Sequence, residues 1–130
     1  MFALDTNTVI YFFKGTGRVK QEMLSVAPGQ IALPAVVLFE LERGCAQSLH
    51  PSRRQRDLEL FLKTVPVIPF ETRSARYAAQ VAATLAESGV SIGPLDTLIA
   101  DMALASNCTL VTHNTAEFSR VPGLQITDWF

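Results

Sequence analysis

The sequence predicts an α/β fold in which a mainly parallel sheet carries helices on both faces. Short apolar runs alternate with longer segments whose apolar residues recur at spacings of three and four. One or two longer segments follow each of the first three short runs, an order typical of parallel strands joined by crossover helices. The chain has 130 residues, which is enough for one substantial core, so we expect a single domain over 1–130.

The short apolar runs are the predicted strands. They are too short for stable helices, and the first of them, Phe-Ala-Leu, follows Met1 directly. The strands are predicted at 2–4, 30–34, 65–70, 108–112 and 124–129.

The longer segments each carry an apolar face with helical spacing. The last of them opens on Pro94, a residue favoured in the first turn of a helix. The helices are predicted at 8–25, 35–49, 52–64, 72–88 and 94–106. Because no repeat, low-complexity tract or linker interrupts the alternation, nothing divides the chain.

The composition is that of an ordinary globular chain, with 48% hydrophobic and 18% charged residues. Eleven Lys and Arg stand against twelve Asp and Glu, which excludes a uniformly basic nucleic-acid binder but not a local basic patch. The sequence has no secretory signal and no apolar run long enough to span a membrane, so we expect a cytoplasmic protein without membrane contact. Cys45 and Cys108 lack zinc-site spacing with His50 or His113, and we expect both thiols to be reduced and buried.

Asp5 follows the first predicted strand directly. In open parallel sheets, ligands bind at the carboxyl ends of strands, so Asp5 lies where a site would form. The ordinary alternative is that Asp5 only caps the helix that begins near Thr6. The choice depends on whether other acids reach the same edge.

Two acids, Glu40 and Glu42, lie in the predicted helix that follows the second strand. Glu40 has Phe39 and Leu41 as sequence neighbours, which suggests a carboxylate directed into a crevice. A solvated helix face, or an ion pair with Arg43, would explain it equally well. Periodicity alone does not choose between the two glutamates.

Asp96 and Asp101 share the helix predicted at 94–106. Five residues turn a helix by about 500°, so the two side chains point about 140° apart and cannot face one site. Small residues at Ala100 and Ala103, on the Asp96 side, favour Asp96. Stabilisation of the helix start by a carboxylate is the simpler explanation for an acid at this place.

Four polar residues lie at the end of the strand predicted at 108–112 or just after it, and we expect them at the same edge of the sheet as Asp5. They are Thr112, His113, Asn114 and Glu117. A histidine in a loop beside asparagine is more often a hydrogen-bonded surface residue than a catalytic one.

Asp5, Glu40, Asp96 and Glu117 each come from near the start of a helix or the end of a strand, and we expect them to meet in one cleft. Carboxylates at close range repel one another and raise each other's pKa unless a cation neutralises them. Oxygen ligands without Cys or grouped His favour Mg²⁺ or Mn²⁺ over Zn²⁺. Such a site typically activates water for attack on a phosphodiester.

The chain resembles the PIN-domain ribonucleases, and most closely the VapC toxins of bacterial toxin-antitoxin pairs. Its motifs have the family's order and approximate spacing. They are LDTN at 4–7, ELERG at 40–44, GPLDTLIADMAL at 93–104, LVTHNTAEF at 110–118 and VPGLQITDW at 121–129. The resemblance implies a three-layer α/β/α sandwich and Mg²⁺-dependent endoribonuclease action on structured RNA such as tRNA or ribosomal RNA. It also implies inhibition by an antitoxin partner and a homodimer.

The family's acidic quartet maps onto Asp5, Glu40, Asp96 and Glu117, and this decides between Glu40 and Glu42. Asp5 and Asp96 are expected to hold the Mg²⁺, for which Mn²⁺ should substitute, while Glu40 and Glu117 complete the cage or orient water. The fourth acid of the family is more often Asp, so the longer Glu117 would reach the metal differently or through water.

Three polar residues beside the acids are expected to hydrogen-bond the metal ligands. They are Thr6, Thr112 and Asn114. The Thr6 hydroxyl could equally cap the backbone at a helix start.

Two other function classes need separate tests. The segment GVSIG at 89–93 matches G-x-S-x-G, and Ser91, an aspartate and His113 follow in the chain order of a serine hydrolase. That motif needs a buried strand before the serine, whereas the preceding segment has helical spacing, so a glycine-rich loop is the better interpretation. A non-catalytic binding module of the same fold is the second alternative, and the retention of all four acids argues against it.

Six of the eleven basic residues fall within 24 positions. They are Arg53, Arg54, Arg56, Lys63, Arg73 and Arg76. We expect the five arginines to contact RNA phosphates, and a solvated helix face is the alternative.

Overall fold

The computed structural model describes residues 1–130 and contains a five-stranded sheet in which all neighbouring strands are parallel. The strand order is β3-β2-β1-β4-β5. The strands are β1 (Phe2–Leu4), β2 (Ile31–Pro34), β3 (Val67–Ile68), β4 (Thr109–Val111) and β5 (Ile126–Thr127).

Seven α-helices and one short 3₁₀ helix connect the strands. The 3₁₀ helix covers Pro28–Gln30. The α-helices are α1 (Thr6–Lys14), α2 (Val19–Leu24), α3 (Ala35–Ala46), α4 (Pro51–Leu62), α5 (Thr72–Glu87), α6 (Pro94–Ala105) and α7 (Thr115–Phe118). None of them is both long and apolar enough to cross a membrane.

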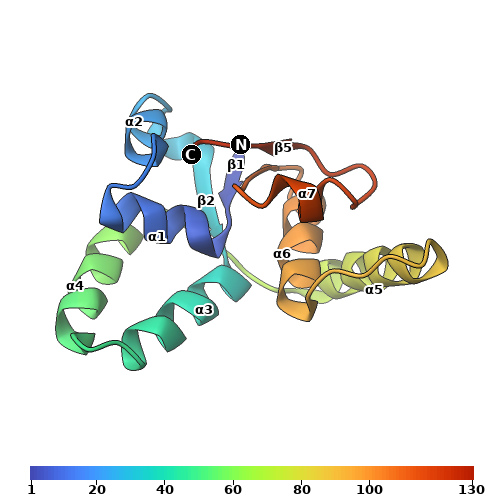
Figure 1. Ribbon diagram of the computed structural model, residues 1–130, viewed down its shortest axis with the longest axis horizontal. Helices are drawn as coiled ribbons and strands as arrows, with labels where there is room; N and C mark the ends of the chain where they lie inside the picture. Colours follow the sequence, from blue (N-terminus) through green and yellow to red (C-terminus); the bar gives the residue numbers. More distant parts are fainter.

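The helices form two layers around the sheet. From β1 the chain moves through β2 to the edge strand β3, and then returns to β4 on the other side of β1. Because parallel crossovers are right-handed, this reversal places the connecting helices on opposite faces. Figure 1 shows α1, α3 and α4 on one side of β1 and β2, and α5 and α6 on the other. The predicted α/β/α arrangement with a parallel sheet is therefore confirmed.

The core lies between the sheet and these helices and forms one cluster of 24 buried residues. Leu4, Leu33 and Leu110, one from each of the three central strands, have no exposed surface. Burying such a side chain contributes about 1.5–3 kcal/mol each, so the central strands are firmly held. Cys45 and Cys108 are free and buried, as expected.

The single helix predicted over 8–25 is wrong, because two glycines divide it into α1 and α2. Gly15 has φ 68° and ends α1, and Gly17 has φ 65° in the following turn. Glycine adopts this left-handed conformation without steric cost, so the chain turns here. The apolar spacing continues across the turn, which is why periodicity did not reveal the break.

The strand order reverses between β1 and β4, which are hydrogen-bonded neighbours. The carboxyl ends of strands at such a switch point leave a crevice that parallel α/β sheets use for ligands. Asp5 and Thr112 directly follow the two strands. This edge of the sheet is therefore where the fold predicts a ligand site.

Candidate active site

Asp5 occupies the junction between β1, β4 and α1. Its backbone N–H donates to the carbonyl of Val111 at 3.1 Å, and its Oδ1 accepts the N–H of Thr8 at 2.9 Å. Asp5 is thus the N-cap of α1, as the simpler interpretation held, but it is also buried, with 5% exposure. Burial raises the pKa of its carboxyl, hydrogen bonds from Thr112 and Thr8 offset part of this, and the charge of Glu40 adds to it. The capping role and a site role are therefore compatible.

Glu40 reaches this edge from α3. Its Oε1 accepts the Thr6 hydroxyl at 2.7 Å, and its Oε2 lies 3.7 Å from a guanidinium nitrogen of Arg43. Glu42 is exposed and accepts a long hydrogen bond from Gln55 of α4 at 3.4 Å. The structure thus places Glu40, and not Glu42, beside Asp5, and gives Thr6 a partner.

Asp96 lies in the first turn of α6, near enough to the other three acids for their charges to act on its carboxyl. Burial, followed by the charges of Glu117, Glu40 and Asp5, raises the pKa of Asp96 to about 6. The charges of Glu117, Glu40 and Asp5 therefore all act on Asp96, although the four predicted acids come from four separate segments of the chain. Asp101 is fully buried elsewhere on α6, as the helix geometry predicted.

Glu117, on α7, joins two loops through its carboxylate. Its Oε1 accepts the N–H of Gly93 at 3.1 Å, and its Oε2 accepts the side-chain amide of Asn114 at 2.6 Å. These two donors lower the pKa of Glu117. Glu117 is therefore charged and fixes the start of α6 against the loop after β4.

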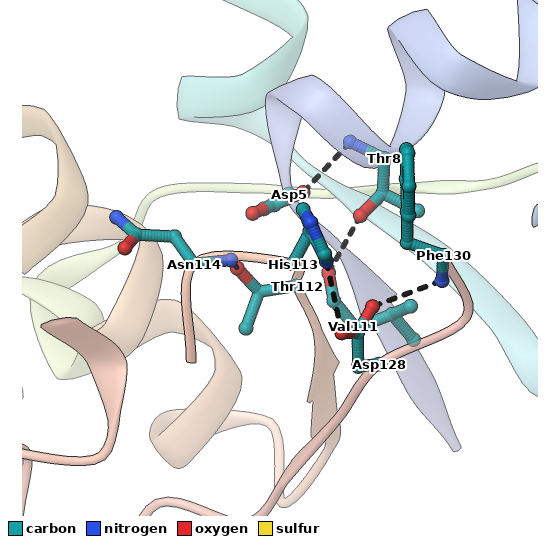
Figure 2. A network of polar contacts seen from close by, with 8 residues as sticks. All are labelled: Asp5, Thr8, Val111, Thr112, His113, Asn114, Asp128 and Phe130. Carbon is teal, nitrogen blue, oxygen red and sulfur yellow. Dashed lines mark hydrogen bonds and ion pairs between the residues drawn. The ribbon is translucent and has the colours of Figure 1, made fainter. Parts of the chain in front are cut away.

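Thr112 and Asn114 complete this loop. The Thr112 hydroxyl accepts the N–H of Asn114 at 3.0 Å and lowers the pKa of the Asp5 carboxyl, while the Asn114 amide donates to Glu117. Figure 2 shows Asp5, Thr112 and Asn114 together beside the end of β4. Both residues thus contact one of the predicted acids directly.

The sequence matches the family model described as PIN domain over residues 2–124. This chain belongs to the PIN-domain family. The "tRNA(fMet)-specific endonuclease VapC" of Salmonella typhimurium is 34% identical to it over 128 residues, covering 98% of this chain and 97% of the relative. "Ribonuclease VapC2" of Rickettsia felis is 34% identical over 131 residues, covering 99% of this chain and 98% of the relative.

Solved structures agree with this placement. The VapBC2 complex of Rickettsia felis, bound to a DNA fragment from its promoter, contains a chain with a TM-score of 0.93 and 33% identity. The DNA-bound VapBC complex of Salmonella typhimurium contains another with a TM-score of 0.93 and 34% identity. In both cases the match covers 99% of this chain and 98% of the other. The PIN domain described here is of the VapC type.

The carboxylates of this PIN domain fit a hard divalent cation by their chemistry. All the candidate donors are oxygens, and burial together with the charges of the other three acids raises the pKa of Asp96. They do not form a finished cage, since no group of three or more His, Cys, Asp and Glu side chains is close enough to hold an ion. Asp5 and Asp96 are the better ligand candidates, because both oxygens of Glu117 already accept hydrogen bonds.

A pocket of about 210 Å³ opens beside Glu40, between α1, α3 and α4. Half of its lining is apolar, and Lys14 and Arg54 contribute positive charge to its wall. Gly44, one turn after Glu40, has open space where a Cβ would be. The room that the sequence suggested near Glu40 is therefore present.

The predicted RNA-contact arginines do not form one patch. Arg53, Arg54 and Arg56 are exposed on α4, whereas Arg73 and Arg76 are exposed on α5. Figure 1 shows α4 and α5 at opposite ends of the molecule. Nearness in sequence was misleading, because strand β3 carries the chain across the sheet between the two helices.

The serine-hydrolase interpretation is not supported by the backbone. Ser91 is exposed in the loop between α5 and α6, so a helix and not a strand comes directly before its loop. His113 pairs with Asp128, its Nδ1 lying 2.9 Å from Oδ2. Ser91 therefore lacks the buried strand that a nucleophile elbow requires.

Sequence reasoning missed two contributors to the site, Thr8 and Gly93. Thr8 donates its N–H to Asp5, and its hydroxyl donates to the carbonyl of Val111 at 3.1 Å. The pattern Asp-x-x-Thr at the start of α1 was an available signal for the first contact. Nothing local indicated that the Gly93 N–H would meet Glu117, 24 residues away.

Proposed function

We propose that this PIN domain is a metal-dependent endoribonuclease and acts as the toxin of a toxin-antitoxin pair. The observation that carries the proposal is the convergence of Asp5, Glu40, Asp96 and Glu117 at the switch point of the sheet. The names of the full-length relatives, endonuclease and ribonuclease, support the same chemistry. Burial and the charges of the three other acids raise the pKa of Asp96 to about 6, a perturbation typical of catalytic sites that favours an enzyme over a non-catalytic binding module.

Asp5 and Asp96 would hold Mg²⁺ or Mn²⁺, which supplies an activated water and neutralises charge that develops on the phosphate. Asp5 is oriented for this by Thr8 and Thr112, so little reorganisation is needed. Glu40, whose Oε1 accepts the Thr6 hydroxyl, would accept a hydrogen bond from the attacking water. Glu117 would act by fixing the start of α6, and with it Asp96.

We propose structured RNA, such as tRNA or ribosomal RNA, as the substrate, and the cytoplasm as the place of action. The name of the Salmonella relative specifies tRNA(fMet), which makes this the first RNA to test. A cognate antitoxin is proposed as partner, since the similar solved structures are VapBC complexes. A homodimer is proposed on the family resemblance alone.

The deciding experiment is incubation of the purified protein with total RNA and with tRNA(fMet), followed by mapping of the cleaved ends. Cleavage should occur at defined positions with Mg²⁺ or Mn²⁺ and stop with EDTA. Asp96→Asn should bind RNA without cutting it. RNA binding without any cleavage by the wild-type protein, with either metal, would favour the binding-module alternative.

A further inference from the structure

Three aromatic rings gather beside the end of β4, next to the carboxylates. His113 directly follows Thr112, the residue that hydrogen-bonds Asp5. The His113 ring stacks on Phe130, with ring centroids 4.2 Å apart and planes inclined by 23°. Tyr11 meets both rings edge-on, at 6.2 Å from His113 and 4.9 Å from Phe130. One face of the His113 ring is therefore occupied by Phe130.

Asp128 fixes the same ring by one edge. Its Oδ2 lies 2.9 Å from Nδ1 of His113, and its Oδ1 accepts the N–H of Phe130 at 2.9 Å. Burial alone would raise the pKa of Asp128, but the Phe130 N–H and His113 outweigh it and lower the pKa. Asp128 thus stays charged and ties His113 to the backbone that carries its stacking partner. Figure 2 shows this network beside Asp5.

Phe130 is itself anchored in the turn between α1 and α2. Its carbonyl accepts the N–H of Arg18 at 3.1 Å. A Cβ at Gly17 would lie 3.0 Å from Cδ2 of the Phe130 ring, which is tighter than an ordinary van der Waals contact, and the left-handed backbone at φ 65° also favours glycine. The support under His113 therefore rests on a separate part of the chain.

Despite these constraints, 47% of the His113 side chain is exposed. An exposed polar pair such as His113–Asp128 contributes little to stability, so this contact by itself does little for the fold. What results is an aromatic ring held in one orientation beside the carboxylates. A fixed and exposed aromatic ring suits the stacking of an unpaired nucleobase.

We propose that His113 is a stacking platform for one nucleobase next to the scissile phosphodiester. This subsite rests on the proposed function, because it requires RNA to bind at the edge of the sheet where His113 lies beside Asp5 (Figure 2). Arg18 lies close enough to act on the charge of Asp128 and adds positive charge for a neighbouring phosphate. His113 is then a positioning residue that acts mainly on substrate binding.

The test uses a short RNA that spans the mapped cleavage site, with one base removed at each flanking position in turn. For the wild-type protein, removal of the stacked base should raise KM about tenfold and change kcat little. His113→Ala should raise KM on the intact RNA by a similar factor and be insensitive to the same missing base. His113→Phe should restore the wild-type pattern, because it keeps the stacking face.

His50→Ala, the same change at the other histidine, is the matched control and should behave as wild type. Equal sensitivity of wild type and His113→Ala to every missing base would overturn the platform. A His113→Phe variant as weak as His113→Ala would also overturn it, in favour of the imidazole hydrogen bond. If the wild-type protein cleaves no RNA at all, the proposed function itself fails, and the subsite with it.

Discussion

At the residue scale, the candidate site consists of carboxylates that the fold holds by specific hydrogen bonds. Asp5 shows this most clearly, because its backbone N–H bonds Val111 while one side-chain oxygen caps α1. Burial raises the pKa of this carboxyl, so its charged form costs free energy even though the side chain also caps α1. A buried carboxyl whose charged form is disfavoured in this way is typical of a functional site.

Asp5→Asn separates the structural role from the chemical one. Asparagine can still accept the N–H of Thr8 and keeps the shape, but it removes the negative charge. We expect RNA cleavage to fall by more than about a hundredfold, and Mn²⁺ binding to weaken, with the melting temperature unchanged or slightly raised. Cleavage assays, metal titration and thermal unfolding measure the three effects. Full cleavage by Asp5→Asn protein in EDTA would contradict the proposed role.

At the element scale, α6 carries two acids with opposite environments. Asp96 faces three other carboxylates, whereas Asp101 is fully buried and neither of its oxygens has a hydrogen-bond partner. Burial raises the pKa of Asp101 to about 7 from 3.8. The folded protein therefore binds this proton more tightly than the unfolded chain does.

The Asp101 carboxyl should make stability depend on pH. Between 3.8 and about 7 the folded state holds the proton that the unfolded state releases, so the unfolding free energy falls as pH rises and levels off above that window. Asp101→Ala should raise the unfolding free energy by about 1–3 kcal/mol at about pH 8 and by much less at about pH 4. Urea denaturation at both pH values measures this.

Glu87→Ala, at the exposed end of α5, is the control and should change stability little at either pH. An equal gain for Asp101→Ala at both pH values would show that the carboxyl does not titrate in this range.

The turn between α1 and α2 offers a matched pair of glycines. Gly15 and Gly17 both have left-handed backbones, but only at Gly17 would a Cβ press against Phe130. Gly15→Ala should lower the unfolding free energy by about 1–2 kcal/mol, from backbone strain alone. Gly17→Ala should lower it further, because the Phe130 ring has to move. Equal losses in denaturant titrations would mean that the ring yields freely.

At the scale of the whole molecule, the five arginines predicted to contact RNA lie on two helices, α4 and α5, at opposite ends of the fold (Figure 1). Arg54 lines the pocket that also contains Glu40, so α4 is the better candidate for holding RNA near the site. Arg73 lies over the ring of Tyr77 on α5, with 5.8 Å from the guanidinium carbon to the ring centroid. The two sets are therefore not interchangeable.

Replacing Arg53, Arg54 and Arg56 together with Ala should weaken RNA binding and flatten its salt dependence. Each lost phosphate contact removes about 0.7–0.9 from the slope of log K against log salt. The cleavage position should not move, since phosphate contacts carry no sequence information. Binding titrated against salt in an Asp5→Asn background measures the slope. Arg73→Ala with Arg76→Ala is the matched control and should keep the original slope, whereas flattening in that variant alone would assign RNA to α5.

Much of this architecture could be predicted from the sequence because it depends on alternation. Because strands and helices have different apolar spacings, their alternation could be recognised, and it predicts a parallel sheet. In a parallel sheet, Asp5 and the loop after β4 lie at the same edge. Glycine turns inside an apolar pattern and four-residue helices such as α7 leave no periodic signal, and the edge strands β3 and β5 are shorter than the apolar runs that predicted them. Contacts between distant loops, such as Gly93 with Glu117 or His113 with Asp128, depend on the complete fold and were not predictable.

The pairing of β1 with β4 also determines when the site can exist. Thr8 bonds the carbonyl of Val111 across 103 residues of sequence, and Asp5 depends on the same junction. Contacts of such long range form late, after most of the loop-closure entropy has been lost. A chain emerging from the ribosome can fold β1 to β3 and their helices first, while Asp5 still lacks Asp96 and Thr112. A nuclease assembled in this order stays inactive during its own synthesis, until β4 has been made and has inserted beside β1.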